Sequence, residues 1–156
     1  MASVLDCSDQ RAWEICQNMH ANDPVCRMLK ISLEEVRNGF ARISMRLDEN
    51  MLNAYGTGHG GYSFLLADTA FGLACNSRGE KAFGQSAHIT YLTFGQPGEL
   101  LTAVAEARSH ANRTGIFDVT VLGEDGRAVA EFRGLSRKVG DQENSQGVVT
   151  SARGAE

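Results

Sequence analysis

The chain has few cysteines, no excess of positive charge and no long apolar run, and each shortage excludes a class of protein. Its four cysteines form no CxxC pair and no Cys/His cluster of zinc spacing, so we expect reduced thiols and no bound metal. Acidic residues (19) outnumber Lys and Arg (15), whereas a general nucleic-acid binder would be basic. The longest apolar stretch, residues 62–75, is too short to cross a membrane and contains Asp68.

The first ten residues, MASVLDCSDQ, also lack the apolar segment of a signal peptide. Together with reduced thiols, this predicts a cytoplasmic protein. With 156 residues and 42% hydrophobic content, the chain suits one domain, which we place at residues 1–139. Residues 140–156 are polar and glycine-rich without periodicity, and we expect them to form a disordered tail.

The N-terminal third predicts one helix followed by two strands. Apolar residues at helical spacing predict a helix from Ser8 to about His20, which the Asn-Asp-Pro sequence at 22–24 would end. A strand is predicted over residues 28–36. After the hairpin signal Asn38-Gly39, residues 40–47 alternate between apolar and polar, as in a second strand.

A nearly all-apolar helix is predicted over residues 60–76, and strands are predicted at 82–94, 100–111, 115–122 and 128–138, with turn residues between them. This order predicts an α+β fold in which a curved antiparallel sheet wraps around one long central helix, with a further helix at the N-terminus. One sheet and one helix leave the sheet edges and a face uncovered, so we expect subunits to associate.

The passage NAYGTGHGGYSFLLAD, residues 53–68, joins a glycine-rich turn to that central helix. A helix N-terminus presents unpaired N–H groups, and glycine at position 60 lets a substrate come close. Carboxylates avoid apolar surroundings because desolvation is costly, so Asp68 indicates chemistry. The Gly60 N–H would stabilise an oxyanion while Asp68 attacks a carbonyl carbon or activates water. Asn53 and His59 would order the turn, the substrate or a water.

Gly60 and Asp68 cannot act on one carbonyl group within a single chain. They are eight residues apart, which is roughly 12 Å along a helix axis. Two antiparallel helices across a dimer axis would bring Gly60 of one chain to Asp68 of the other. The spacing therefore predicts a homodimer with two shared active sites.

Residues 56–61 also match the GxGxxG dinucleotide fingerprint. Only strands follow this motif, whereas a dinucleotide-binding fold needs a second crossover helix. We therefore do not expect a nicotinamide or flavin cofactor.

The order of elements and the spacing of Asn53, His59-Gly60-Gly61 and Asp68 resemble the hotdog-fold acyl-CoA thioesterases. Residues 67–71, Ala-Asp-Thr-Ala-Phe, resemble the phenylacetate-degradation branch, and the resemblance covers about residues 28–138. It implies hydrolysis of phenylacetyl-CoA or a hydroxylated relative to the free acid and CoA, with the motif residues in the active site. It also implies a homotetramer built as a dimer of dimers, and no cofactor, because coenzyme A is part of the substrate.

Five further residues are expected to contact the substrate. Ser86 is a candidate because, in related thioesterases, a hydroxyl in this region assists the catalytic water. Gly61 and Phe71 are expected beside the thioester and the acyl group. Arg137 and Lys138 are expected near the phosphates of CoA, since the last strand lies near the nucleotide groove in this fold.

Two other functions remain open. A medium-chain acyl-CoA thioesterase is possible because the size of the acyl pocket depends on packing. A non-catalytic acyl-CoA-binding protein could keep the same fold but would not need Asp68. A hotdog-fold hydratase is disfavoured, because its motif has a histidine a few residues after the aspartate, and here none follows until His88.

Overall fold

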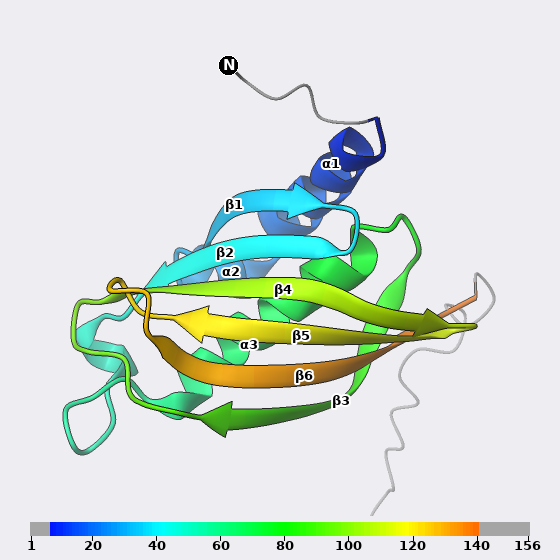
Figure 1. Ribbon diagram of the computed structural model, residues 1–156. Helices are drawn as coiled ribbons and strands as arrows, with labels where there is room; N and C mark the ends of the chain where they lie inside the picture. The colour runs from blue at the N-terminus through cyan, green and yellow to red at the C-terminus, as the bar shows by residue number, and fades with distance from the viewer. Residues whose placement is uncertain (1–6, 141–156) are drawn as a thin grey trace, which may run out of the picture.

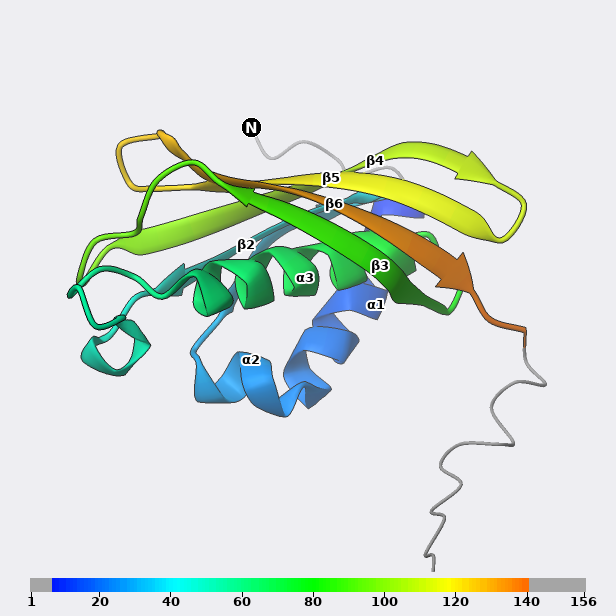
Figure 2. The same cartoon turned by 90° about the horizontal axis from the view of Figure 1, so that it is seen from below.

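Six strands form one curved antiparallel sheet, and the helices lie on its concave side (Figure 1, Figure 2). The computed structural model describes residues 7–140. The strands are arranged in the order β1-β2-β4-β5-β6-β3, so β1 and β3 are the two edges. This is the predicted α+β hotdog arrangement, with α3 under the sheet and α1 as the N-terminal helix.

The helices are α1 (Cys7–Asn22), α2 (Pro24–Met28) and α3 (Gly60–Asn76), with a 3-10 turn, η1 (Glu49–Met51). The strands are β1 (Ser32–Arg37), β2 (Phe40–Arg46), β3 (Ala82–Tyr91), β4 (Leu100–Ala111), β5 (Thr114–Leu122) and β6 (Ala128–Lys138). The predicted bounds of α3, β4 and β6 are confirmed. Among residues 7–140, no helix is long and apolar enough to cross a membrane. The predicted tail, apart from Gly140, lies outside the described residues.

The prediction of a strand starting at residue 28 was wrong, because a second helix begins at Pro24. The carboxylate of Asp23 accepts hydrogen bonds from the N–H groups of Val25 and Cys26, so Asp23 is the N-cap. Pro24 fits the first helical position, where no N–H is needed. The chain therefore makes another helical turn before β1 begins.

The core lies between α3 and the concave face of the sheet. Phe71 of α3 is 1% exposed, and its ring centre lies 5.6 Å from that of Phe117 and 5.7 Å from that of Phe132. Gly134 of β6 faces the same ring, because an added Cβ would lie 2.7 Å from an atom of the Phe71 ring. The absence of a side chain at this position lets the sheet approach the helix closely.

Three cysteine side chains, those of Cys16, Cys26 and Cys75, are buried free thiols. Burial raises the pKa of Cys16 and Cys75 to about 12 and that of Cys26 to about 11. They are therefore protonated at neutral pH and behave as small apolar groups rather than as nucleophiles. The side chain of Cys7 lies outside what the structure describes.

An ion pair with a buried carboxylate and a partly exposed arginine connects the loop after β3 to the hairpin between β5 and β6. Glu99 is 7% exposed, and Arg127 donates to both oxygens of its carboxylate, at 2.7 and 2.8 Å. The backbone N–H groups of Gln96 and Glu124 donate to the same carboxylate. The Arg127 guanidinium holds the pKa of Glu99 below its usual value, and Arg127 also donates to the carbonyl of Phe94 at 3.0 Å.

Replacing Arg127 with glutamine should lower the free energy of unfolding by about 2–3 kcal/mol, because it leaves the Glu99 charge buried without its partner. Urea denaturation of both proteins measures this difference. Glu124→Gln is the matched control, since it breaks only an exposed ion pair with Arg46, which is worth less than about 1 kcal/mol. Equal stability of Arg127→Gln and the unmodified protein would contradict this account of the pair.

Candidate active site

The glycine-rich turn before α3 is held by its own hydrogen bonds. The side-chain oxygen of Asn53 accepts from the N–H groups of Tyr55 and Thr57, and its amide donates to the Thr57 hydroxyl at 2.9 Å. The N–H of Gly58 donates to the carbonyl of Gly95 at 2.8 Å, which attaches the turn to the loop after β3. Asn53 therefore acts within this chain to organise the turn.

His59 is the N-cap of α3 and leaves the amide of Gly60 available. Its Nδ1 accepts the N–H of Gly61 at 3.0 Å, so in the neutral ring the proton lies on Nε2. Within residues 7–140, the N–H of Gly60 has no hydrogen-bond partner. The ring of Tyr91 covers one side of this glycine, because a Cβ added to Gly60 would lie 3.1 Å from two of its ring carbons. The helix start thus presents one free amide beside an aromatic ring.

Asp68 lies about two turns further along α3, on a strip that the rest of residues 7–140 leaves uncovered. Leu66 and Ala67 beside it are fully buried, whereas Asp68 and Gly61 are exposed. The apolar helix surface around the carboxyl group still desolvates it and raises the pKa of Asp68. The wrapped helix therefore keeps one exposed strip, which a second molecule can cover.

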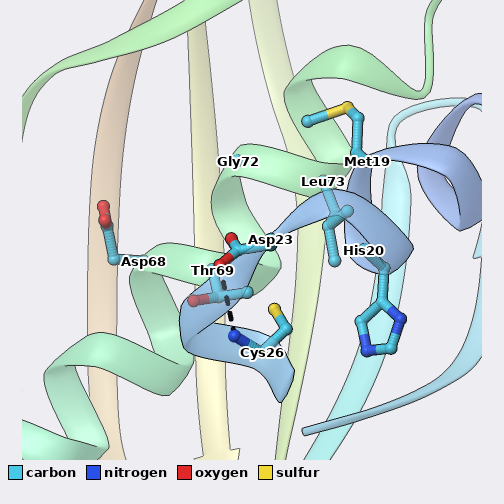
Figure 3. A pocket seen from close by; sticks show the side chains of 8 residues that line it. All are labelled: Met19, His20, Asp23, Cys26, Asp68, Thr69, Gly72 and Leu73. Atoms are coloured by element: carbon cyan, nitrogen blue, oxygen red, sulfur yellow. Dashed lines mark hydrogen bonds between the residues drawn. The ribbon is translucent and has the colours of Figure 1, made fainter. Parts of the chain in front are cut away.

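Asp68 borders two cavities, one on each side of α3. The first, of about 310 Å³, lies between α3 and β3 and is lined by Asp68, Phe71, Gly72 and residues 83–87. The second, of about 230 Å³, lies between α3 and the helices α1 and α2 (Figure 3). Figure 3 shows the carboxylate of Asp68 pointing away from Asp23 and His20, which line the second cavity. The carboxylate is therefore directed away from the helices that cover α3.

A β-bulge interrupts β3 beside the first cavity. The pairing with β6 shifts at Gln85, which is the extra residue of the bulge. Ala87 lies opposite Gly134, on the face toward α3, and Ser86 lies opposite Leu135. Because side chains alternate along a strand, that of Ser86 starts on the face away from α3. Ser86 belongs to the cavity wall, but its hydroxyl is not directed at Asp68 of the same chain by this register.

The other expected substrate contacts lie further from the free amide. Phe71 borders the first cavity, although its ring is packed in the core. Arg137 is exposed at the end of β6, opposite the start of β3, and Lys138 next to it is ion-paired with Glu80. Since Gly60 lies at the other end of β3, roughly 30 Å separates these cations from Gly60 of the same chain.

Sequence reasoning missed two features of this region, the Tyr91 ring over Gly60 and the bulge at Gln85. Alternation could place Tyr91 on the inner face of its strand, but no local signal predicts its contact with a residue 31 positions earlier.

Within residues 7–140, no group of three or more His, Cys, Asp or Glu side chains is arranged to hold a metal ion.

Comparison with known proteins identifies relatives of this chain. Residues 55–130 match the sequence profile of the thioesterase superfamily. The acyl-coenzyme A thioesterase PaaI of Escherichia coli is 38% identical over 130 residues, which are 83% of this chain and 93% of PaaI. The structure of the E. coli PaaI protein, from the phenylacetic acid degradation operon, matches with a TM-score of 0.83 and 37% identity, covering 85% of this chain and 96% of that chain.

Two further structures are similar. A variant of the phenylacetic acid degradation protein PaaI from Thermus thermophilus is 32% identical, with a TM-score of 0.72, over 75% of this chain and 100% of its own. A hypothetical thioesterase from Streptococcus pneumoniae, solved with coenzyme A, is 29% identical, with a TM-score of 0.68, over 70% of this chain and 89% of its own. This chain shares the fold of E. coli PaaI and is 38% identical to it over most of both sequences. It therefore belongs to the hotdog-fold thioesterase superfamily.

Proposed function

We propose that the protein hydrolyses acyl-CoA thioesters, with phenylacetyl-CoA or a hydroxylated phenylacetyl-CoA as substrate, to the free acid and CoA. One observation carries this proposal: a free amide at Gly60 and a carboxylate with a raised pKa at Asp68 lie on the same helix. The E. coli relative is an acyl-CoA thioesterase, and the streptococcal relative was solved with CoA. CoA is then part of the substrate, and no other cofactor is required.

A second copy of the chain would complete the site. β3 is an edge strand (Figure 1), and most of its residues are exposed. Four large apolar side chains on β3 or directly after it are about half exposed, namely Phe83 (57%), Tyr91 (48%), Leu92 (55%) and Phe94 (58%). An apolar edge with unpaired backbone groups is a template for pairing with another strand. We therefore propose a homodimer in which two β3 edges pair antiparallel.

The path of α3 along β3 supports the position of the shared site. Gly60 lies against Tyr91 at the end of β3, and Asp68 borders the same cavity as residues 83–87. The helix and the strand therefore run side by side in opposite directions. A two-fold axis midway between Gly60 and Asp68 would lie about 6 Å along the helix from each, and would bring each amide to the other chain's carboxylate. The axis would cross β3 about two residues before Tyr91. This part of β3 lies between the bulge and Tyr91, and its pairing with β6 is regular.

In this site each chain has a separate chemical role. The N–H of Gly60 stabilises the negative charge that develops on the thioester oxygen. Asp68 of the second chain either attacks the acyl carbon or takes a proton from a water that attacks it. When the carbon–sulfur bond breaks, the CoA thiolate leaves and takes up a proton, which on the water route is the one that Asp68 accepted. On the nucleophilic route, a water then hydrolyses the anhydride between the acyl group and Asp68, which releases the free acid and restores the carboxylate. His59 positions the amide by capping the helix through Gly61.

Arg137 and Lys138 also fit this arrangement, because antiparallel pairing brings the start of one β3 toward the end of the other. They would then lie nearer to the second chain's Gly60 than to their own, and we propose them as contacts of the CoA phosphates. The dimer of dimers and the cytoplasmic location expected from the sequence stay predictions.

Replacing Asp68 with asparagine should lower kcat for phenylacetyl-CoA by at least about 100-fold, because the amide is neither a nucleophile nor a base. Release of the CoA thiol, followed with a thiol reagent, measures the rate. Asp9→Asn is the matched control. Asp9 lies in α1 and accepts a hydrogen bond from the N–H of Asn38, near the end of α3 that is remote from Gly60. Asparagine can accept the same bond. Wild-type turnover by Asp68→Asn would contradict the proposed role.

The value of kcat/KM should fall at acid pH with an apparent pKa above the ordinary aspartate value of about 3.9. Desolvation raises the pKa of Asp68, and only the ionised carboxylate can act, so the rate rises with pH as Asp68 loses its proton. Rates from pH 3.5 to 8 measure this, with circular dichroism to confirm folding at each pH. A rate that stays constant down to pH 3.5 in folded protein would be incompatible with Asp68 as the acting group.

Mixed dimers can test whether the site is shared. Gly60→Pro removes the amide N–H, and its Cβ also displaces the Tyr91 ring, which would lie 3.1 Å from it, so the variant disables the Gly60 half of the site. The backbone accepts proline at this first helical position, because His59 is already extended (φ −67°, ψ 128°). A dimer of Gly60→Pro with Asp68→Asn contains one intact and one doubly altered site, so it should recover about half of the wild-type activity, while each parent dimer is nearly inactive. Purification through two different tags isolates the mixed dimer, and an inactive mixed dimer would rule out the shared site.

A further inference from the structure

We infer that the ring of Tyr91 selects aryl over straight-chain acyl groups by packing against the acyl group of the bound thioester. The inference rests on the proposed function, and it concerns a choice between substrates that the sequence leaves open. Tyr91 is the last residue of β3 and is 48% exposed. Its ring carbons lie 3.1 Å from the position of a Cβ on Gly60, and its hydroxyl oxygen lies 3.4 Å from it. The half-exposed ring therefore stands beside Gly60, whose amide would bind the thioester oxygen.

The backbone that carries the ring is held in place before any substrate binds. Tyr91 lies opposite Ala130 of β6, which is fully buried, so its side chain starts on the core face of the sheet. The next residue, Leu92, donates its N–H to the carbonyl of Val129 at 2.9 Å. The loop that follows Tyr91 is also attached to the glycine-rich turn that precedes Gly60, because the N–H of Gly58 donates to the carbonyl of Gly95. A fixed wall loses little conformational freedom when a ligand packs on it.

The dimensions of a phenylacetyl group fit this wall. A thioester oxygen hydrogen-bonded to Gly60 would lie about 2.9 Å from the amide nitrogen. One methylene separates the carbonyl from the phenyl ring, which lets the phenyl ring reach the centroid distance of about 4.5–7 Å from Tyr91 at which aromatic rings attract each other. Such a contact improves binding by about 2- to 10-fold beyond area burial. A straight acyl chain has no ring and would gain no such contact.

The position of Tyr91 in the proposed dimer makes this contact part of the active site. Tyr91 moves with Gly60 of its own chain, because the two are in contact. Antiparallel pairing of the β3 edges would bring both toward the second chain's residues 83–87, which border the cavity at Asp68. The half of the ring that is exposed in the single chain would then face the acyl group rather than solvent.

Selectivity can be measured as the ratio of kcat/KM for phenylacetyl-CoA to that for hexanoyl-CoA. Tyr91→Leu should lower this ratio by more than twofold and up to about 10-fold, mainly through the phenylacetyl-CoA value, because the aromatic partner is lost. Tyr91→Phe keeps the ring and should leave the ratio within twofold of wild type. Met28→Ala, which removes a large apolar side chain that is 70% exposed at the end of α2, should leave it unchanged. Size-exclusion chromatography and thermal denaturation show whether each variant keeps its assembly and fold.

The remaining outcomes each overturn the inference. An unchanged ratio in Tyr91→Leu, or equal losses for both substrates, would mean that Tyr91 has no role or only a structural one. A ratio that falls as far in Tyr91→Phe as in Tyr91→Leu would assign selection to the hydroxyl and not to ring packing. If the wild-type protein hydrolyses neither thioester, the proposed function fails and this inference fails with it, whereas the first three outcomes leave the proposed function intact.

Discussion

Gly60 and Asp68 are separated by about 12 Å along the axis of α3. The need for a second chain in the proposed active site depends on this distance. No rearrangement of side chains within one chain brings the two groups to one carbonyl. An antiparallel second copy would do so, and the chain leaves uncovered the surfaces that such a copy needs. These are the edge of β3 and the strip of α3 that carries Gly61 and Asp68. Asp68 is exposed in the single chain, as expected if a second chain has to reach it to complete the site.

A series of fixed contacts holds the Gly60 amide, and it begins far from the chemistry. The buried pair of Glu99 and Arg127 orders the loop after β3. That loop accepts a hydrogen bond from the glycine-rich turn, and His59 then caps the helix. Because stabilisation of an oxyanion depends on a preorganised donor, this ion pair would support the proposed catalysis as well as stability. If the loop after β3 became more mobile, we would expect the orientation of the Gly60 N–H to become less well defined.

The fold class and the extent of α3 could be predicted from the sequence, because each rests on a local pattern. An apolar run between a glycine turn and Ser77 marks the helix, and strand alternation marks the sheet. The helix α2 was missed since Asp23-Pro24 can end one helix and begin another. The bulge at Gln85 directly follows Gly84, and a glycine within a strand can mark a bulge. The glycine does not tell which residue is the extra one, so the sequence did not show that the side chain of Ser86 starts on the face away from α3. The contact of Tyr91 with Gly60 depends on how the sheet curves over α3, which no local pattern contains.

The most direct measurement of the shared site is a crystal structure with a ketone analogue of phenylacetyl-CoA, in which a methylene replaces the sulfur and prevents hydrolysis. The account predicts the ketone oxygen about 3 Å from the Gly60 nitrogen of one chain, and the ketone carbon within about 3.5 Å of the Asp68 carboxylate, or of a water bound to it, in the other chain. A ketone group bound by one chain alone, or remote from either residue, would contradict it.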